Sequence, residues 1–292
     1  MTIKRTFILG DTWLYYKLYC GARTSDIILI ETIKPLTEQL LQDKLINKWF
    51  FIRYNDPDFH LRIRFELYDV QKIGEVILAI KNALQEYVDD DIIYKIQTDN
   101  YQREIERYGS NTIEELESLF YHESTMLLKA LDAIEDEELY FLFVLKLIDQ
   151  LLNSFEYTTQ QRLDLATINA EAYKKEFNAD KTLNKQLDKK YRGLKNALTE
   201  FLETAYTHTE YEYLEQVLKE KEVQTNTLIK KILKYEKEGL LEMPLTDLLS
   251  SYIHMLVNRA FRTKQRFYEL VSYDFLVRYY KLLMFKQTVN KK

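Results

Sequence analysis

The segment "KWFFIRYNDPDFHLRIRF", residues 48–65, decides the fold that we expect for this chain. Two runs rich in aromatic and β-branched residues, 48–54 and 60–67, flank the turn-forming residues "NDPDF". Such a pattern is typical of two neighbouring strands joined as a β-hairpin. The segment therefore predicts an antiparallel pair of strands near the N-terminus.

The second run of the hairpin has an unusual face. Successive side chains of a strand point to opposite faces, so the apolar residues of "HLRIRF" share one face and belong in a core. The other face carries His60, Arg62 and Arg64. Arginines two apart on a strand lie roughly 7 Å from each other and repel unless an anion covers them. That anion is either a set of acidic neighbours on an exposed sheet or a ligand.

Strand and helix signals alternate on both sides of the hairpin. The expected order is a strand at 12–19, a helix at 25–44, the two hairpin strands, a helix at 69–88 and a strand at 92–101. This βαββαβ order resembles a ferredoxin-like split βαβ unit, an antiparallel sheet with its helices on one face. The opposite face is then free for a ligand or for the rest of the protein.

The remainder of the chain has helical periodicity. The expected helices are 112–134, 137–156, 159–178, 184–207, 210–237 and 245–288. Thr112 and Glu115 have the spacing of a capping box at the first of them. We therefore expect an α+β fold, one domain over residues 1–292, in which a sheet half (1–110) packs against a mostly helical half (111–292).

Composition limits the class of protein. Of the 292 residues 46% are hydrophobic, and six glycines and three prolines leave no room for a long linker. The formal net charge of −5 argues against a nucleic-acid binder. The single cysteine, Cys20, suits a reducing cytosol, and no apolar run is long enough for a membrane span or a signal peptide. We expect a cytoplasmic protein.

Two further segments are denser in polar residues than packing requires. In "YQREIERYGS", residues 101–110, Glu104 and Arg107 stand three apart, which fits a plain ion pair or an arginine oriented toward a planar anion. In "SYIHMLVNRAFR", residues 251–262, His254 and Asn258 are one helical turn apart, although a histidine there is also common as a bonded core residue. No metal-ligand spacing, glycine-rich phosphate loop or nucleophile elbow occurs, so we expect neither a metal nor a cofactor.

Four motifs in this order resemble one known family. "DTWLYYKLYCG", "KWFFIRYNDPDFHLRIRF", "YQREIERYG" and "SYIHMLVNRAFR" are similar to the C-terminal, glutamate-eliminating domain of lantibiotic dehydratases, which also occurs alone as the "thiopeptide-type bacteriocin biosynthesis protein". The resemblance implies a lyase that acts on a ribosomal precursor peptide. A serine or threonine of that peptide is first glutamylated from glutamyl-tRNA, and loss of glutamate then leaves dehydroalanine or dehydrobutyrine.

The resemblance also implies site residues. The family's catalytic positions match Arg62, Arg64, Glu104, Arg107 and His254. We expect His254 to transfer a proton, Arg64 and Arg107 to clamp the anion, Glu104 to orient Arg107, and Arg62 to support them. Four neighbouring residues are expected to contact the substrate: His60, Tyr108, Asn258 and Arg259.

The resemblance leaves partners and alternatives open. A chain of this length has no room for the large glutamylation domain, so we expect a separate tRNA-dependent glutamylation protein and no direct contact with nucleic acid; relatives suggest a homodimer. One alternative is the cycloaddition of two dehydroalanines that forms a pyridine ring in thiopeptides, and another is a peptide-binding subunit without catalysis. Retention of the arginine, glutamate and histidine set favours elimination.

Overall fold

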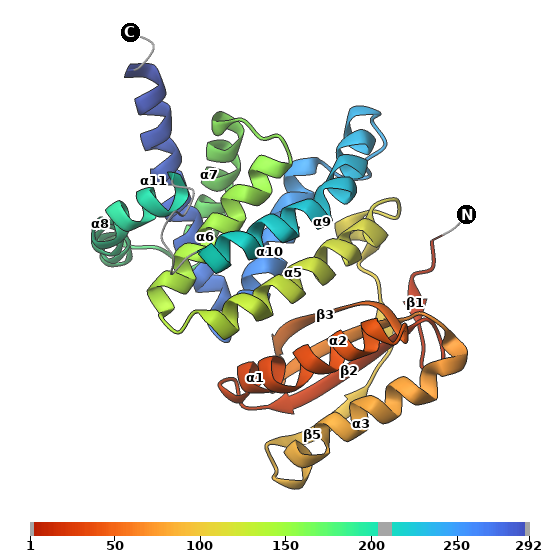
Figure 1. The fold of residues 1–292 in the computed structure, drawn as a ribbon. Coiled ribbons are helices and arrows are strands. Elements are labelled where there is room, and N and C mark those ends of the chain that lie inside the picture. The colour runs from red at the N-terminus through yellow and green to blue at the C-terminus, as the bar shows by residue number, and fades with distance from the viewer. Residues whose placement is uncertain (1–2, 204–211, 290–292) are drawn as a thin grey trace.

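The fold combines an antiparallel sheet with a helical second half, as the sequence predicts. The computed structural model describes residues 3–203 and 212–289. In Figure 1 the red-to-orange sheet unit occupies the lower part of the molecule and the green-to-blue helices the upper part. Within the described residues, every helix is too short or too polar to cross a membrane. The ends of two predicted helices, at residues 204–207 and 210–211, lie outside the described residues.

Two sheets and a series of helices make up the chain. The strands are β1 (Thr6–Phe7), β2 (Trp13–Cys20), β3 (Ile46–Asn55), β4 (Phe59–Leu67), β5 (Ile93–Thr98) and β6 (Tyr101–Gln102). The helices are α1 (Thr24–Ile27), α2 (Lys34–Gln42), α3 (Ile73–Asp89), α4 (Ile105–Tyr108), α5 (Ile113–Ala133), α6 (Glu137–Ser154), α7 (Thr159–Glu176), α8 (Lys181–Glu203), α9 (Glu212–Lys237), α10 (Leu245–Ala260) and α11 (Gln265–Val289). The main sheet has the order β3-β4-β2-β5, and β1 pairs with β6 in a separate ribbon that was not predicted.

One face of the main sheet builds a core with the N-terminal helices. Leu61, Ile63 and Phe65 of β4 are buried there against α2 and α3, as the alternation of the strand predicts. The opposite face carries the cationic residues of β4. Burial of this many apolar side chains on one side fixes the register of the hairpin, because a slip of one residue would expose all of them.

The predicted helix 25–44 is not continuous. A π-helical turn, Ile28–Ile33, separates α1 from α2, and Pro35 stands at the start of α2. Proline has no N–H to donate to the carbonyl four residues earlier. The backbone N–H of Lys34 instead bonds Leu29, five residues back, which is the π-helical pattern.

Side chains from the helical half close the outer edge of β3. Asn258 of α10 accepts from Arg53 N (3.0 Å) and donates to Arg53 O (2.9 Å), as a neighbouring strand would. Arg259 donates from Nε to Phe51 O at 3.0 Å, and Ser124 of α5 accepts from Phe51 N at 3.4 Å. The sheet unit and the helical half are therefore joined by the hydrogen bonds that an edge strand normally leaves unmade.

Two expectations about helix ends are wrong. Thr112 makes no side-chain bond to the first turn of α5, because its hydroxyl donates to Tyr108 O in the turn before it, and Glu115 pairs with Lys231 instead. The predicted helix 245–288 is two helices, α10 and α11. The chain breaks after Ala260, where Phe261 is extended and Lys264 has a positive φ of 56°.

Candidate functional site

Arg64 is the centre of the polar side of the sheet. Its guanidinium carbon lies over three aromatic rings: 4.5 Å from the ring centre of Tyr15, 4.8 Å from Tyr101 and 5.2 Å from Phe50. The residue is 9% exposed, and its buried Nε has no hydrogen-bond partner. Arg64 also makes no ion pair with any carboxylate of the described residues. A buried charge without a counterion is costly, so this site favours an anion from outside.

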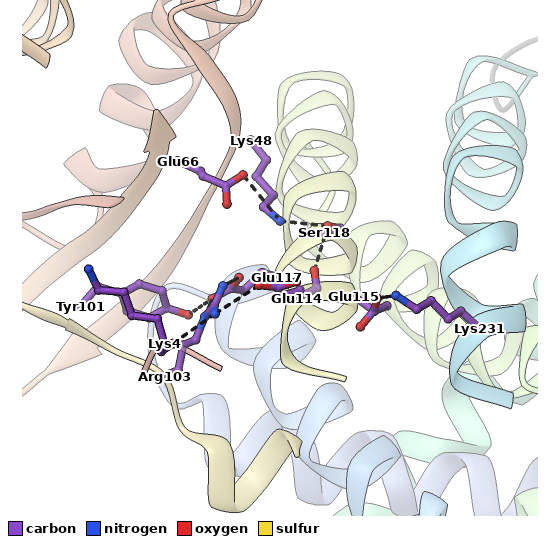
Figure 2. A network of polar contacts seen from close by, with 10 residues as sticks. All are labelled: Lys4, Lys48, Glu66, Tyr101, Arg103, Glu114, Glu115, Glu117, Ser118 and Lys231. Atoms are coloured by element: carbon purple, nitrogen blue, oxygen red, sulfur yellow. Dashed lines mark hydrogen bonds and ion pairs between the residues drawn. The ribbon is translucent and has the colours of Figure 1, made fainter. Parts of the chain in front are cut away.

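The three rings around Arg64, those of Tyr15, Phe50 and Tyr101, form an aromatic box. Hydrogen bonds to a carboxylate of α5 hold Tyr101 in place. Tyr101 donates to Glu117 Oε1 at 2.7 Å, and Arg103 donates to both oxygens of the same carboxylate at 2.7 Å. Figure 2 shows these three side chains between β6 and α5. Burial, with the nearby Glu117 charge second, raises the pKa of Tyr101 well above its usual range. Arg103 neutralises Glu117, which therefore is not the counterion that Arg64 lacks.

A small cavity connects Arg64 with two other predicted segments. Its volume is about 30 Å³, room for roughly one water molecule, and its wall includes Arg64, Glu104, Tyr108 and Met255. Tyr108 is buried, and burial raises its pKa to about 12. Larger clefts, of about 670 Å³ along α9 and 650 Å³ between α1 and the α10–α11 connection, lie away from these residues. The small cavity is the better candidate because charged groups converge on it.

The predicted Glu104–Arg107 pair exists at the mouth of this cavity. Arg107 Nε lies 3.3 Å from Glu104 Oε2, and both side chains are exposed. One carboxylate oxygen thus holds one edge of the guanidinium. The remaining donors of Arg107 are available to a second planar anion.

His254 lies on the helix that borders the cavity, but it is not itself part of the cavity wall. Met255, the next residue, lines the cavity, whereas Nδ1 of His254 bonds Glu269 of α11. Glu269 is 0% exposed and also accepts from Arg266 Nη1 at 3.0 Å. A carboxylate can only accept, so Nδ1 carries the proton and Nε2 is left as the acceptor. The structure therefore brings the helix of His254, though not its ring, into the wall of the site.

Glu269 is a residue that the sequence did not point to. Fifteen residues separate it from His254, about 22 Å along a continuous helix, so the pair appeared far apart. The break after Ala260 turns α11 back toward α10 and brings the two side chains together. An extended residue followed by a positive φ within a helical pattern is the structural cause, and no glycine or proline marks it in the sequence.

Two more of the predicted residues lie on the same sheet face. His60 is buried, stacks on Tyr19 at 4.6 Å and lies with Nδ1 2.9 Å from Asp58 O. Arg62 donates from Nε to His60 Nε2 at 3.0 Å and lies 3.4 Å from the ring centre of Tyr54. Burial lowers the pKa of His60 from its usual value. His60 is therefore a neutral support for Arg62.

Asn258 and Arg259 are already occupied within the protein. Asn258 bonds the backbone of β3, and Arg259 is 0% exposed and pairs with Glu123 as well as with Phe51 O. These contacts hold α10 against the sheet. We propose that both residues position the site and do not contact a substrate.

A metal site is not evident in the described ranges: no group of three or more His, Cys, Asp or Glu side chains there could hold a metal ion.

Comparison with known proteins identifies the family. The family model "Lantibiotic biosynthesis dehydratase C-term" matches residues 13–280, which is most of the chain and includes Arg64, Glu104, Arg107 and His254. The chain belongs to this family. Its family is therefore that of the C-terminal domains of lantibiotic biosynthesis dehydratases.

Named relatives agree with this membership, and solved structures share the fold. Subtilin biosynthesis protein SpaB of Bacillus subtilis is 25% identical over 179 residues, which cover 59% of this chain and 17% of SpaB. Nisin biosynthesis protein NisB of Lactococcus lactis subsp. lactis is 29% identical over 128 residues, which cover 43% of this chain and 12% of NisB. The chain thus spans less than a fifth of the length of these relatives. The tRNA-dependent lantibiotic dehydratase MibB from Microbispora sp. 107891 has a similar fold, with a TM-score of 0.70 and 16% identity over 93% of this chain and 28% of MibB. The pyridine synthase TbtD of thiomuracin biosynthesis has a TM-score of 0.67 and 14% identity over 93% of this chain and 100% of TbtD.

Proposed function

We propose that the chain is a lyase that eliminates glutamate from glutamylated serine or threonine of a precursor peptide. The observation that carries this proposal is the guanidinium of Arg64, buried among three aromatic rings with no carboxylate partner in the described residues. Glutamate supplies the missing carboxylate. Arg107, held by Glu104 at the cavity mouth, provides a second cation for the same anion.

The reaction needs no redox partner. A base removes the proton from Cα of the esterified residue, the C–H electron pair becomes the Cα=Cβ double bond, and the Cβ–O bond breaks. The electrons of that bond leave with the carboxylate oxygen of glutamate. The arginines stabilise negative charge on the peptide carbonyl and on the departing carboxylate.

His254 is the proton acceptor in this proposal. Glu269 holds the tautomer in which Nε2 is free, and 29% of the His254 side chain is exposed, so a peptide has access to it. Glu269 also stabilises the imidazolium that forms when the proton arrives. Arg62, supported by His60, adds positive charge beside Arg64.

We propose that a separate tRNA-dependent glutamylation protein supplies the glutamylated peptide, and that the enzyme works in the cytoplasm, as a homodimer, without binding nucleic acid itself. TbtD, which this chain covers over its full length, shows that the same fold occurs as a chain of this size.

The strand order and the βαββαβ connectivity support our proposal that the sheet half is ferredoxin-like.

A synthetic peptide that carries an O-glutamyl serine tests the reaction without tRNA. Purified protein is expected to convert it to the dehydroalanine peptide and free glutamate, followed by mass spectrometry. His254→Ala is expected to bind the peptide but to slow elimination by on the order of 10² to 10⁴, the usual share of a positioned proton-transfer group, so that the ester accumulates.

One outcome would replace elimination by the pyridine-forming reaction. Wild-type protein that leaves the ester untouched, but joins two dehydroalanines of an already dehydrated peptide, would show it. The likeness to TbtD is one of fold at 14% identity, and cycloaddition gives no reason for an unpaired arginine with a glutamate-oriented second arginine.

A further inference from the structure

A row of cations extends from the candidate cavity along the face of the sheet opposite α2 and α3. Arg62 lies opposite Lys17 on β2, and Lys95 on β5 lies opposite Tyr19, one row further from Arg64. These three residues, Lys17, Arg62 and Lys95, form the cationic strip. None of them takes part in the packing of the opposite, helix-covered face.

The strip is not neutralised within the described residues. Only Lys17 has a carboxylate partner, Asp99 Oδ2 at 2.5 Å. Arg62 lies on the Tyr54 ring and Lys95 Nζ lies 4.8 Å from the ring centre of Tyr19, contacts that orient a cation and leave its charge in place. Because the whole chain has a formal net charge of −5, the positive charge of the strip is confined to this part of the surface.

The pairing of Lys17 with Arg62 has an energetic cost. Residues directly opposite on antiparallel strands have Cβ atoms roughly 5 Å apart, and like charges there destabilise the sheet. A sheet selected for stability alone would place a carboxylate at one of the two positions. An anion that lies across both strands would relieve the repulsion.

We infer that the cationic strip binds an acidic side chain of the substrate peptide, two residues away from the glutamylated one. This inference rests on the proposed function, since Arg64 marks where the glutamyl group lies. Arg62 is two residues from Arg64, about 7 Å, and side chains two apart on an extended peptide have the same spacing. An extended substrate therefore presents its next side chain on that face to the strip.

A peptide fits these observations better than a nucleic acid. Two unpaired cations and Asp99 beside them are too few for a phosphate backbone, which requires a longer row of phosphate contacts. A single Asp or Glu matches the strip in charge. Tyr54 is 38% exposed beside Arg62, so its ring can contact the apolar stem of such a residue.

The test compares two synthetic O-glutamyl serine peptides that differ only in Asp or Asn two residues from the serine. Binding is measured by fluorescence anisotropy and elimination by mass spectrometry. Lys95→Glu is expected to lower the Asp-over-Asn preference about 3- to 10-fold. This variant should instead favour a third peptide that carries Lys at the same position. In the wild type, the preference for Asp should be smaller at high salt. Lys81→Glu, the same change at an exposed lysine of α3 on the other side of the sheet, is the matched control and is expected to keep the preference.

The two readouts separate this inference from the reaction. Preferential binding of the Asp peptide that depends on Lys95, without elimination, would support the strip and refute the lyase. Elimination with equal binding of both peptides, or an equal loss in both lysine variants, would refute the strip. Lys95-dependent binding of a short RNA in place of any preference for Asp would assign the surface to nucleic acid instead.

Discussion

Two buried arginines of this protein have similar surroundings and different partners. Arg259 is fully buried with its guanidinium carbon 4.5 Å from the ring centre of Phe120, and Arg64 is nearly as buried at the same distance from Tyr15. Arg259 meets Glu123 and the carbonyl of Phe51, whereas Arg64 meets no carboxylate of the described residues. The protein thus gives one guanidinium an internal counterion and leaves the other for a ligand.

The largest expected effect is the difference in unfolding free energy between variants of Arg259 and of Arg64. Arg259→Met removes the ion-pair partner of the buried Glu123 carboxylate, and the free energy of unfolding is expected to fall by about 3–5 kcal/mol in urea titrations. Arg64→Met removes a charge that has no counterion, and its unfolding free energy is expected to stay equal or to rise. A large loss in Arg64→Met would mean that a hidden internal partner exists and would break the comparison.

For elimination activity, in contrast to stability, we expect substitution of Arg64 to have a large effect. Arg64→Lys keeps the charge but loses the planar pair of donors, so elimination of the glutamyl ester is expected to fall by about 10²–10³ in kcat/KM. Its thermal unfolding should match the wild type, which serves as the control for folding. Near-normal turnover by Arg64→Lys would show that charge alone is sufficient at this position.

The product should stabilise the wild type through Arg64. Free glutamate at ten times its dissociation constant is expected to raise the unfolding free energy by about 1.4 kcal/mol, and the gain should vanish in Arg64→Gln. Glutamine, which lacks the side-chain carboxylate, is the control ligand in the same thermal melts. A stabilisation that survives in Arg64→Gln would place the glutamate elsewhere.

The smallest effect concerns pH and His60. Burial lowers the pKa of His60, so the unfolded chain binds more protons than the folded one once the pH falls below about 6.5. The free energy of unfolding should therefore decrease as the pH falls through that range, and His60→Gln should weaken the decrease. Burial lowers the pKa of His122 as well, so His122→Gln is needed to separate the two contributions. An identical pH dependence in His60→Gln and wild type would contradict this account.

The hairpin was predictable because its pattern repeats every two residues. The apolar positions of β4 and the turn before it permit one register, and Arg64 was predicted on the polar face for that reason. The aromatic box around Arg64 was not predicted, because Tyr15, Phe50 and Tyr101 come from three other strands and meet only in the folded structure.

Helix boundaries were harder to predict for local physical reasons. Thr112 has a capping-box partner in sequence, yet the carbonyl of Tyr108 in the preceding turn takes its hydroxyl. The break between α10 and α11 has no glycine or proline, so periodicity alone runs through it. That break brings Glu269 to His254, and the histidine's partner was missed with it.

The closure of β3 by Asn258 and Arg259 has a consequence for protein engineering. A fragment cut near residue 110 would expose the N–H and C=O groups of Phe51 and Arg53 along a hydrophobic edge strand. Such an edge recruits strands from other molecules, so the sheet half by itself is expected to aggregate. Among the described residues, β5 forms the other edge of the main sheet. A fused tag or peptide meant to extend the sheet therefore has to be designed against β5.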